Sequence, residues 1–165
     1  MSTTAKILVT PRALTRDGHP ALDQLRAAGY TLVFSRAGQT PTESELLQLV
    51  PDCVGWLAGV EPVSAAVIDA APSLKAISRN GTGVDNLPME ALKQKGVAVL
   101  RAEGANARGV AELAITLMLS ALRHVPTIDA GMKAGHWQRV LGREIDGRII
   151  AVVGYGRIGS EFAKM

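Results

Sequence analysis

The sequence predicts an α/β fold built on a doubly wound parallel sheet. Along about the first 100 residues, short β-branched runs alternate with segments that have the period of a helix. The β-branched runs are mostly apolar throughout, which is typical of parallel strands that are buried on both faces. A chain of 165 residues, 47% of them hydrophobic and 20% charged, also has enough apolar material for one ordinary core.

The elements follow one another in a regular order. Strands are expected at residues 7–10, 32–35, 54–58, 76–78 and 97–100. Helices are expected between them at residues 22–28, 43–50, 65–71 and 89–95. Glycine or proline stands at the helix ends, as is common where a helix stops, at Gly29, Pro51, Pro72 and Gly96. Connections between such strands are right-handed, which predicts a doubly wound arrangement.

A longer helix is expected at residues 107–124, with Pro126 as a stop signal just beyond it. Its apolar residues are distributed around nearly the whole circumference of the helix. We therefore expect the helix to be buried on more than one side, between two domains or under a partner subunit. Residues 126–143 mix apolar and charged positions and are interpreted as an arm or a packed excursion. A further strand is expected at residues 149–153.

A glycine fingerprint follows that expected strand. Gly154, Gly156 and Gly159 form a G-x-G-x-x-G pattern between the strand and a helical segment at residues 160–164. The first glycine permits a tight turn, the second lets the backbone approach a pyrophosphate, and the third allows close helix packing. We therefore predict dinucleotide binding rather than a merely tight turn. The acidic residue that binds the ribose would fall after Met165, so NAD and NADP both stay open.

A second glycine-rich loop, residues 78–86, follows the fourth expected strand. Its backbone N–H groups could hold a small carboxylate, with Arg79 as a fixed positive charge nearby. The alternative is a simple turn in which Asp85 or Asn86 helps to start the next helix. Spacing alone does not separate the two interpretations.

Composition excludes several classes of protein. The net charge of +3 is spread without long runs of one sign, which excludes a polybasic tail for nucleic acid. Cys53 is the single cysteine, so neither an intrachain disulfide nor a cysteine-based metal site can form. No signal-like start and no apolar run of about 18 residues is present, so we expect a cytoplasmic protein with no membrane partner.

Several motifs in order resemble one family. They are residues 79–86, 104–106, 110–112, 135–137, 147–148 and the fingerprint. Together they resemble the D-isomer-specific 2-hydroxyacid dehydrogenases, most closely the D-3-phosphoglycerate dehydrogenase branch. The resemblance implies a flavodoxin-like substrate-binding domain at residues 1–100. Residues 101–165 would begin a Rossmann NAD-binding domain, with the interdomain helix, a dimerisation arm, the first strand and the glycine-rich turn.

The same resemblance implies roles for residues on the substrate side. The backbone at Thr82 and Gly83 would hold the substrate carboxylate, and Asn106 would lie near the reacting atoms. Together with Arg79, these form the predicted substrate site. The loop at residues 58–62 has no Arg or Lys for a phosphate, which weakens the case for 3-phosphoglycerate. Ala102 and Glu103 replace the family's usual Thr-Pro and add negative charge.

On the cofactor side, the resemblance implies that Val110 and Thr82 border the nicotinamide. Arg157 and Ile158 would offer backbone N–H groups to the pyrophosphate, beside the three fingerprint glycines. In the family, the Arg, the carboxylate and the His that act on the substrate all follow the fingerprint, so we expect no catalytic residue in this chain.

The resulting hypothesis is an NAD-dependent oxidoreductase. It would transfer a hydride between NAD(H) and a small D-2-hydroxy acid or 2-keto acid, with 3-phosphoglycerate among the candidates, and would form a homodimer. The chain itself would lack the C-terminal catalytic half and be inactive alone. The alternative is a non-catalytic NAD-binding dimerisation module, like the corepressors that resemble this family. An unrelated flavodoxin-like binding domain would not need the fingerprint.

Overall fold

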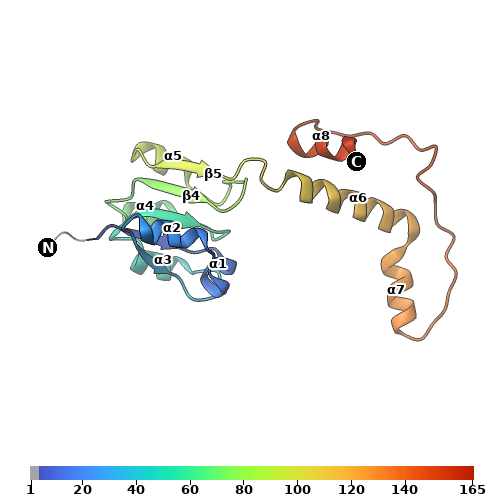
Figure 1. The fold of residues 1–165 in the computed structure, drawn as a ribbon, viewed down its shortest axis with the longest axis horizontal. Helices are drawn as coiled ribbons and strands as arrows, with labels where there is room; N and C mark the ends of the chain where they lie inside the picture. The colour runs from blue at the N-terminus through green and yellow to red at the C-terminus, as the bar shows by residue number, and fades with distance from the viewer. Residues whose placement is uncertain (1–3) are drawn as a thin grey trace. The chain divides into compact units, whose positions relative to one another are not determined.

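The computed structural model describes residues 4–165, which divide into two compact units (Figure 1). The first unit ends at Glu103, and the second is Gly104–Met165. This boundary lies close to the one expected after residue 100. No helix among the described residues is both long and apolar enough to cross a membrane.

The first unit contains a five-stranded parallel sheet. Its strands are β1 (Lys6–Val9), β2 (Thr31–Phe34), β3 (Cys53–Ala58), β4 (Ala76–Arg79) and β5 (Ala98–Arg101), in the order β2-β1-β3-β4-β5. This is the doubly wound order of flavodoxin-like folds, in which the chain reverses direction across the sheet between β1 and β3. The prediction of an α/β fold with a parallel sheet is confirmed, and each strand lies within a residue or two of its expected place.

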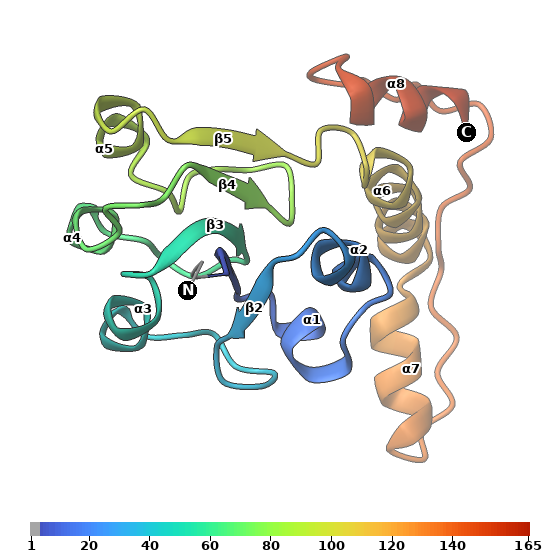
Figure 2. The ribbon, with the colours of Figure 1, turned by 60° about the vertical axis from the view of Figure 1, so that its left-hand side comes forward.

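Five helices cover this sheet: α1 (Arg12–Asp17), α2 (Ala21–Ala27), α3 (Glu43–Leu49), α4 (Ala65–Asp69) and α5 (Met89–Gln94). Figure 2 shows α3, α4 and α5 in a row along one face, with α1 and α2 on the other. Side chains cap two of them, because Thr42 accepts from the Glu45 N–H and Ser64 accepts from the Val67 N–H. The sequence pattern did not predict α1, because its two apolar residues, Ala13 and Leu14, are adjacent and show no helical spacing.

The core lies between the sheet and the row α3 to α5. Strand and helix side chains that are almost fully buried fill it, namely Leu8, Trp56, Ile77, Leu46, Ile68 and Leu92. The other face is less well covered: Ser78 is exposed, and Leu100 is 58% exposed. The prediction that the strands are buried on both faces is therefore wrong for β4 and β5. The reason is that α2 packs at the β2 end of this face, so it does not reach β4 and β5.

The second unit contains three helices, α6 (Ala107–Arg123), α7 (Val125–Lys133) and α8 (Arg157–Lys164), and α8 packs along α6. The chain leaves α6 at His124, whose left-handed backbone (φ 56°) lets its N–H bond to the Ser120 and Ala121 carbonyls. Pro126 is not the expected stop signal. It stands in the first turn of α7, where its missing N–H costs no helical hydrogen bond.

Residues 134–156 form neither helix nor strand, so the prediction of a strand at 149–153 is wrong. Ile149 is 99% exposed and Val153 is 100% exposed. A strand needs a neighbour for its backbone hydrogen bonds, and no strand lies beside this segment among the described residues. The expected burial of α6 is also incomplete, since Leu113 and Leu117 are more than half exposed.

Candidate functional site

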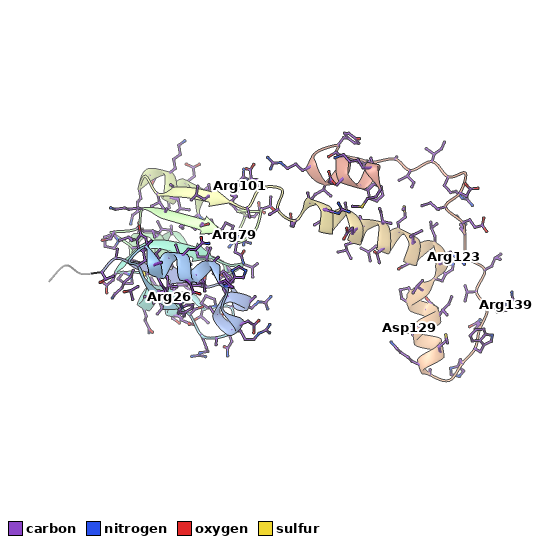
Figure 3. The ribbon with its side chains drawn as sticks, in the orientation of Figure 1. Arg26, Arg79, Arg101, Arg123, Asp129 and Arg139 are labelled. Atoms are coloured by element: carbon purple, nitrogen blue, oxygen red, sulfur yellow. The ribbon has the colours of Figure 1, made fainter. Side chains whose placement is uncertain are left out.

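The predicted substrate loop begins at the carboxyl end of β4, where parallel α/β sheets place their ligands. Arg79, which is labelled in Figure 3, ends the strand. The residue is only 9% exposed. Its Nη1 donates to the Asn80 carbonyl at 2.8 Å, and its Nε donates to Asn86 Oδ1 at 3.3 Å. A Cβ on Gly81 would lie 2.9 Å from Arg79 Nη1. The guanidinium therefore lies against the glycine-rich loop, and a side chain at residue 81 would displace it.

Asn86 joins this loop to the preceding one. Its Nδ2 donates to the carbonyl of Glu61 at 2.7 Å and to that of Gly59 at 3.3 Å. The alternative in which Asp85 or Asn86 starts the next helix is wrong, because α5 begins at Met89 with Pro88 as its N-cap. The Asn86 side chain instead holds two loops together.

Thr82 and Gly83, the predicted carboxylate-binding residues, follow in the same loop. Thr82 is half-buried and Gly83 is exposed. Within residues 4–165 the Gly83 N–H makes no hydrogen bond, so it can donate to a ligand. With the buried Arg79 charge a few residues before it, this segment has the chemistry of a small-anion site.

A buried polar cluster that was not anticipated from the sequence lies beside this loop. It consists of Thr10 at the end of β1, Trp56 in β3, and Gly59 and Glu61 in the loop after β3. Glu61 is 1% exposed and Thr10 is fully buried. One signal was available, a single acidic residue in an otherwise apolar loop directly after a strand. The residues meet only because parallel strands end at the same edge.

In the second unit, the glycine fingerprint forms a turn into α8. Gly154 has a φ of 90°, a backbone conformation that favours glycine. A Cβ on Gly159 would lie 2.2 Å from the Gly154 carbonyl oxygen, so the helix can approach the turn only with glycine there. A Cβ on Gly156 would meet nothing within 4 Å. Local packing thus requires Gly154 and Gly159, whereas Gly156 borders open space.

The turn opens beside a groove of about 290 Å³ within the second unit. Its lining residues come from the start of α6 and from α8, namely Gly104, Ala107, Arg108, Arg157, Ser160 and Glu161. Arg157 and Ile158 begin α8, and the backbone N–H groups of a first helical turn are directed out of the helix end. These groups and the positive end of the helix dipole favour an anion.

Asn106 and Val110, the other predicted site residues, lie at the start of α6. Asn106 is exposed and precedes the helix, and its carbonyl accepts the Val110 N–H at 3.0 Å. Val110 is half-buried. The structure thus brings Arg79, Thr82 and Gly83 together in the first unit. It brings Asn106, Val110 and the fingerprint together in the second.

The single thiol belongs to the core and to neither candidate site. Cys53 is fully buried at the beginning of β3, and its Sγ donates to the Leu49 carbonyl at 3.2 Å. Burial raises the pKa of the Cys53 thiol, and this outweighs the opposing effect of the nearby Lys6 charge. The thiol is therefore protonated at neutral pH and is a poor nucleophile.

Comparison with protein families gives one match over most of the chain. The model of the D-isomer specific 2-hydroxyacid dehydrogenase catalytic domain matches residues 7–162. D-3-phosphoglycerate dehydrogenase from Archaeoglobus fulgidus is 46% identical over 147 residues, which make up 87% of this chain and 27% of that protein. Hydroxypyruvate reductase from Thermotoga maritima is 38% identical over 125 residues, 74% of this chain and 41% of that protein. The chain thus spans less than half the length of these relatives.

Solved structures share the fold. The TT0316 protein from Thermus thermophilus has a TM-score of 0.86 and 32% identity, over 96% of this chain and 51% of that one. Two others show the likeness of fold alone. An NADPH-dependent glyoxylate/hydroxypyruvate reductase from Sinorhizobium meliloti, solved with NADP and malonate, has a TM-score of 0.74 and 22% identity, over 98% and 50% of the two chains. An NAD⁺-bound 3-phosphoglycerate dehydrogenase from Entamoeba histolytica has a TM-score of 0.77 and 23% identity, over 98% of this chain and 50% of that one.

Proposed function

The chain belongs to the D-isomer specific 2-hydroxyacid dehydrogenase family, and from that premise we propose the activity of the complete protein. It transfers a hydride between a nicotinamide dinucleotide, NAD(H) or NADP(H), and a small D-2-hydroxy acid or the matching 2-keto acid. The first unit binds the acid, and the second begins the cofactor-binding domain. The observation that carries the proposal is the loop after β4, where a buried guanidinium lies against a glycine-rich segment with an available N–H.

The substrate carboxylate is the group that suits this loop. The Gly83 N–H donates to one carboxylate oxygen, and the backbone at Thr82 contributes beside it. Arg79 is held in place by two hydrogen bonds within the protein, to Asn80 and Asn86. Its charge therefore acts through a fixed position and does not depend on a mobile side chain, which lowers the cost of ordering the site when the acid binds.

The glycine turn before α8 fits the pyrophosphate of a dinucleotide. Gly156 leaves room where a side chain would block close approach, and Arg157 and Ile158 at the helix start are the residues whose N–H groups we propose bind the phosphates. When bound, the nicotinamide ring accepts or donates the hydride. Val110, one turn into α6, is the residue of the second unit that we propose borders it.

The acid–base chemistry requires residues beyond those of this chain. In the family it resembles, an Arg, a carboxylate and a His that act on the substrate come after the fingerprint. The described residues provide binding groups for an anion and for phosphates, and we assign none of them as a proton carrier. We therefore expect this chain alone to be inactive toward any 2-hydroxy acid.

A second copy of the chain is the proposed partner of the second unit. Leu113, Leu117 and Leu119 on α6 are 40–60% exposed, and Trp137 and Leu141 in the following arm are 79% and 94% exposed. Apolar patches of this kind mark surfaces that another protein surface covers. We propose that α6 and the arm form the homodimer contact.

The test uses the protein from the complete reading frame. Purified protein is mixed with NADH or NADPH and with glyoxylate, hydroxypyruvate or phosphohydroxypyruvate, and absorbance at 340 nm is followed. Turnover of at least one 2-keto acid is expected. Gly83→Pro removes the proposed N–H donor and should raise the KM for the keto acid by about tenfold. Gly83→Ala keeps the N–H and serves as the matched control.

Two outcomes would contradict this proposal. Equal effects of the two substitutions would show that the Gly83 N–H does not bind the substrate. Tight binding of NADH with no turnover of any 2-keto acid would favour a non-catalytic binding module over an enzyme.

A further inference from the structure

The polar cluster at the ends of β1 and β3 is built around the carboxylate of Glu61. The Thr10 hydroxyl and the Gly59 N–H, the latter at 2.9 Å, both donate to Glu61 Oε1. Thr10 Oγ1 in turn accepts from Trp56 Nε1 at 2.9 Å and from the Gly59 N–H at 3.2 Å. The Thr10 hydroxyl also lies 3.2 Å from the Leu57 carbonyl, so its one proton has two possible acceptors, and the Trp56 and Gly59 N–H groups use its two lone pairs.

An acidic side chain at a buried position is costly unless donors surround it. Here an apolar residue at position 61 would leave the Thr10 hydroxyl without its carboxylate acceptor and would remove the acceptor of the Gly59 N–H at 2.9 Å. Gly59 has no space for a side chain either, because a Cβ there would lie 2.6 Å from Glu61 Oε2 and 3.1 Å from the Pro11 Cα. The Gly59 backbone thus lies between the Glu61 carboxylate and the backbone of Pro11.

The cluster connects to the substrate loop through Asn86. That side chain donates to the Glu61 and Gly59 carbonyls and accepts from Arg79 Nε. In the same region the Asn80 N–H donates to the Ala58 carbonyl at 2.8 Å. A continuous chain of hydrogen bonds therefore runs from the end of β1, through the loop after β3, to the guanidinium at the end of β4.

We propose that Glu61 is a positioning residue for the substrate loop. Its carboxylate fixes the backbone of residues 59–61, whose carbonyls orient Asn86, and Asn86 orients Arg79 against residues 80–83. It contacts no substrate. This role rests on the proposed function insofar as residues 82–83 bind the substrate carboxylate, but the ordering of the loop can be measured without it.

The first test measures amide hydrogen exchange in this chain. In Glu61→Ala, segments 58–63 and 79–86 should exchange about tenfold faster, while β2 and α2 keep their rates. Asn86→Ala leaves the buried carboxylate in place and should raise the exchange rates of segment 79–86 by a similar factor. If Glu61→Ala does not fold, this second variant tests whether the hydrogen-bond chain orders the loop. Glu90→Gln, an exposed glutamate on α5, is the control and should change nothing. Uniform acceleration across the first unit, or none in segment 79–86, would overturn the proposal.

The second test uses the conservative variant. The amide oxygen of Glu61→Gln can accept the same two hydrogen bonds, so its exchange rates should stay within about twofold of the original chain. In the complete enzyme, Glu61→Ala should raise the KM for the 2-keto acid about tenfold with the KM for NADH unchanged, and Glu61→Gln should restore it. Loss of function in both variants alike would overturn the positioning role. A complete protein with no activity toward any 2-keto acid would refute the proposed function alone, because the exchange rates would still decide the role of Glu61.

Discussion

Two apolar segments of this chain have similar sequences, but only one of them forms a strand. Strand β1 is Lys-Ile-Leu-Val, with Leu8 and Val9 fully buried between β2 and β3. Residues 149–153 are Ile-Ile-Ala-Val-Val, which is even richer in β-branched residues, yet they form no strand, and Val153 is fully exposed. The difference is the presence of neighbours on both sides of β1.

The comparison extends to the two units that contain these segments. Polar groups of the first unit form buried networks, such as the cluster around Glu61. In the second unit, the ion pair of Arg108 with Glu112 is exposed, and that of Lys164 with Glu161 is partly exposed. Exposed pairs of this kind contribute little to stability. Interactions in the first unit should therefore be the more costly ones to remove.

The largest expected difference in stability is between valine-to-alanine substitutions in these two segments. Val9→Ala should lower the free energy of unfolding by about 2–3 kcal/mol, because it removes two buried carbons and leaves a cavity. Val153→Ala should change it by less than about 0.5 kcal/mol, because that side chain is already in water. Urea denaturation of this chain followed by circular dichroism measures both. Equal losses would mean that residues 149–153 are packed in solution.

A pair of glycine substitutions should have a smaller effect within the second unit. Gly159→Ala places a Cβ against the Gly154 carbonyl and should destabilise the packing of α8 by about 1–2 kcal/mol. Gly156→Ala meets no atom and should leave the free chain unchanged. Hydrogen exchange of α8 distinguishes the two variants. In the complete protein, Gly156→Ala should weaken NADH binding if the cofactor approaches that backbone. Unchanged affinity would contradict the proposed role of Gly156.

The smallest expected effect is on a surface ion pair of α8. A hydrogen bond from Lys164, and then its charge, lower the pKa of the Glu161 carboxyl. A lowered folded-state pKa means that the stabilisation is present at neutral pH and is lost as the pH falls through that value. Titration of the Glu161 carboxyl by NMR should give a midpoint below the ordinary value for glutamate. Lys164→Met should raise it, and an unchanged midpoint would show that the pair does not form.

Local signals were sufficient for much of the fold. The apolar runs and helical periods predicted all five strands of the sheet and the helices α2 to α5 to within a residue or two, because each signal lies within one element. The fingerprint predicted the turn into α8 for the same reason. Helix α1 was not predicted because its two apolar residues are adjacent and show no helical spacing. The interruption at His124 was not predicted because a left-handed non-glycine residue has no reliable sequence signal.

Some residues of the candidate site could likewise be named from the sequence, and others could not. Thr82, Gly83 and the fingerprint glycines could be named from the order of their motifs, since they act through backbone that short segments provide. The buried state of Arg79 and the cluster of Thr10, Trp56 and Glu61 could not, because their partners are brought together from separate strands.

Periodicity, glycine spacing and composition were thus enough to predict an α/β chain with a glycine-rich turn into a helix, whereas the candidate residues of the substrate loop came from the order of the motifs and the family that they resemble. Which apolar segment becomes a strand, which face of the sheet is covered, and why an acidic residue is buried at position 61 depended on the assembled sheet. Hydrogen bonding between strands and the desolvation of polar groups are properties of neighbours in space, and a linear pattern does not record them.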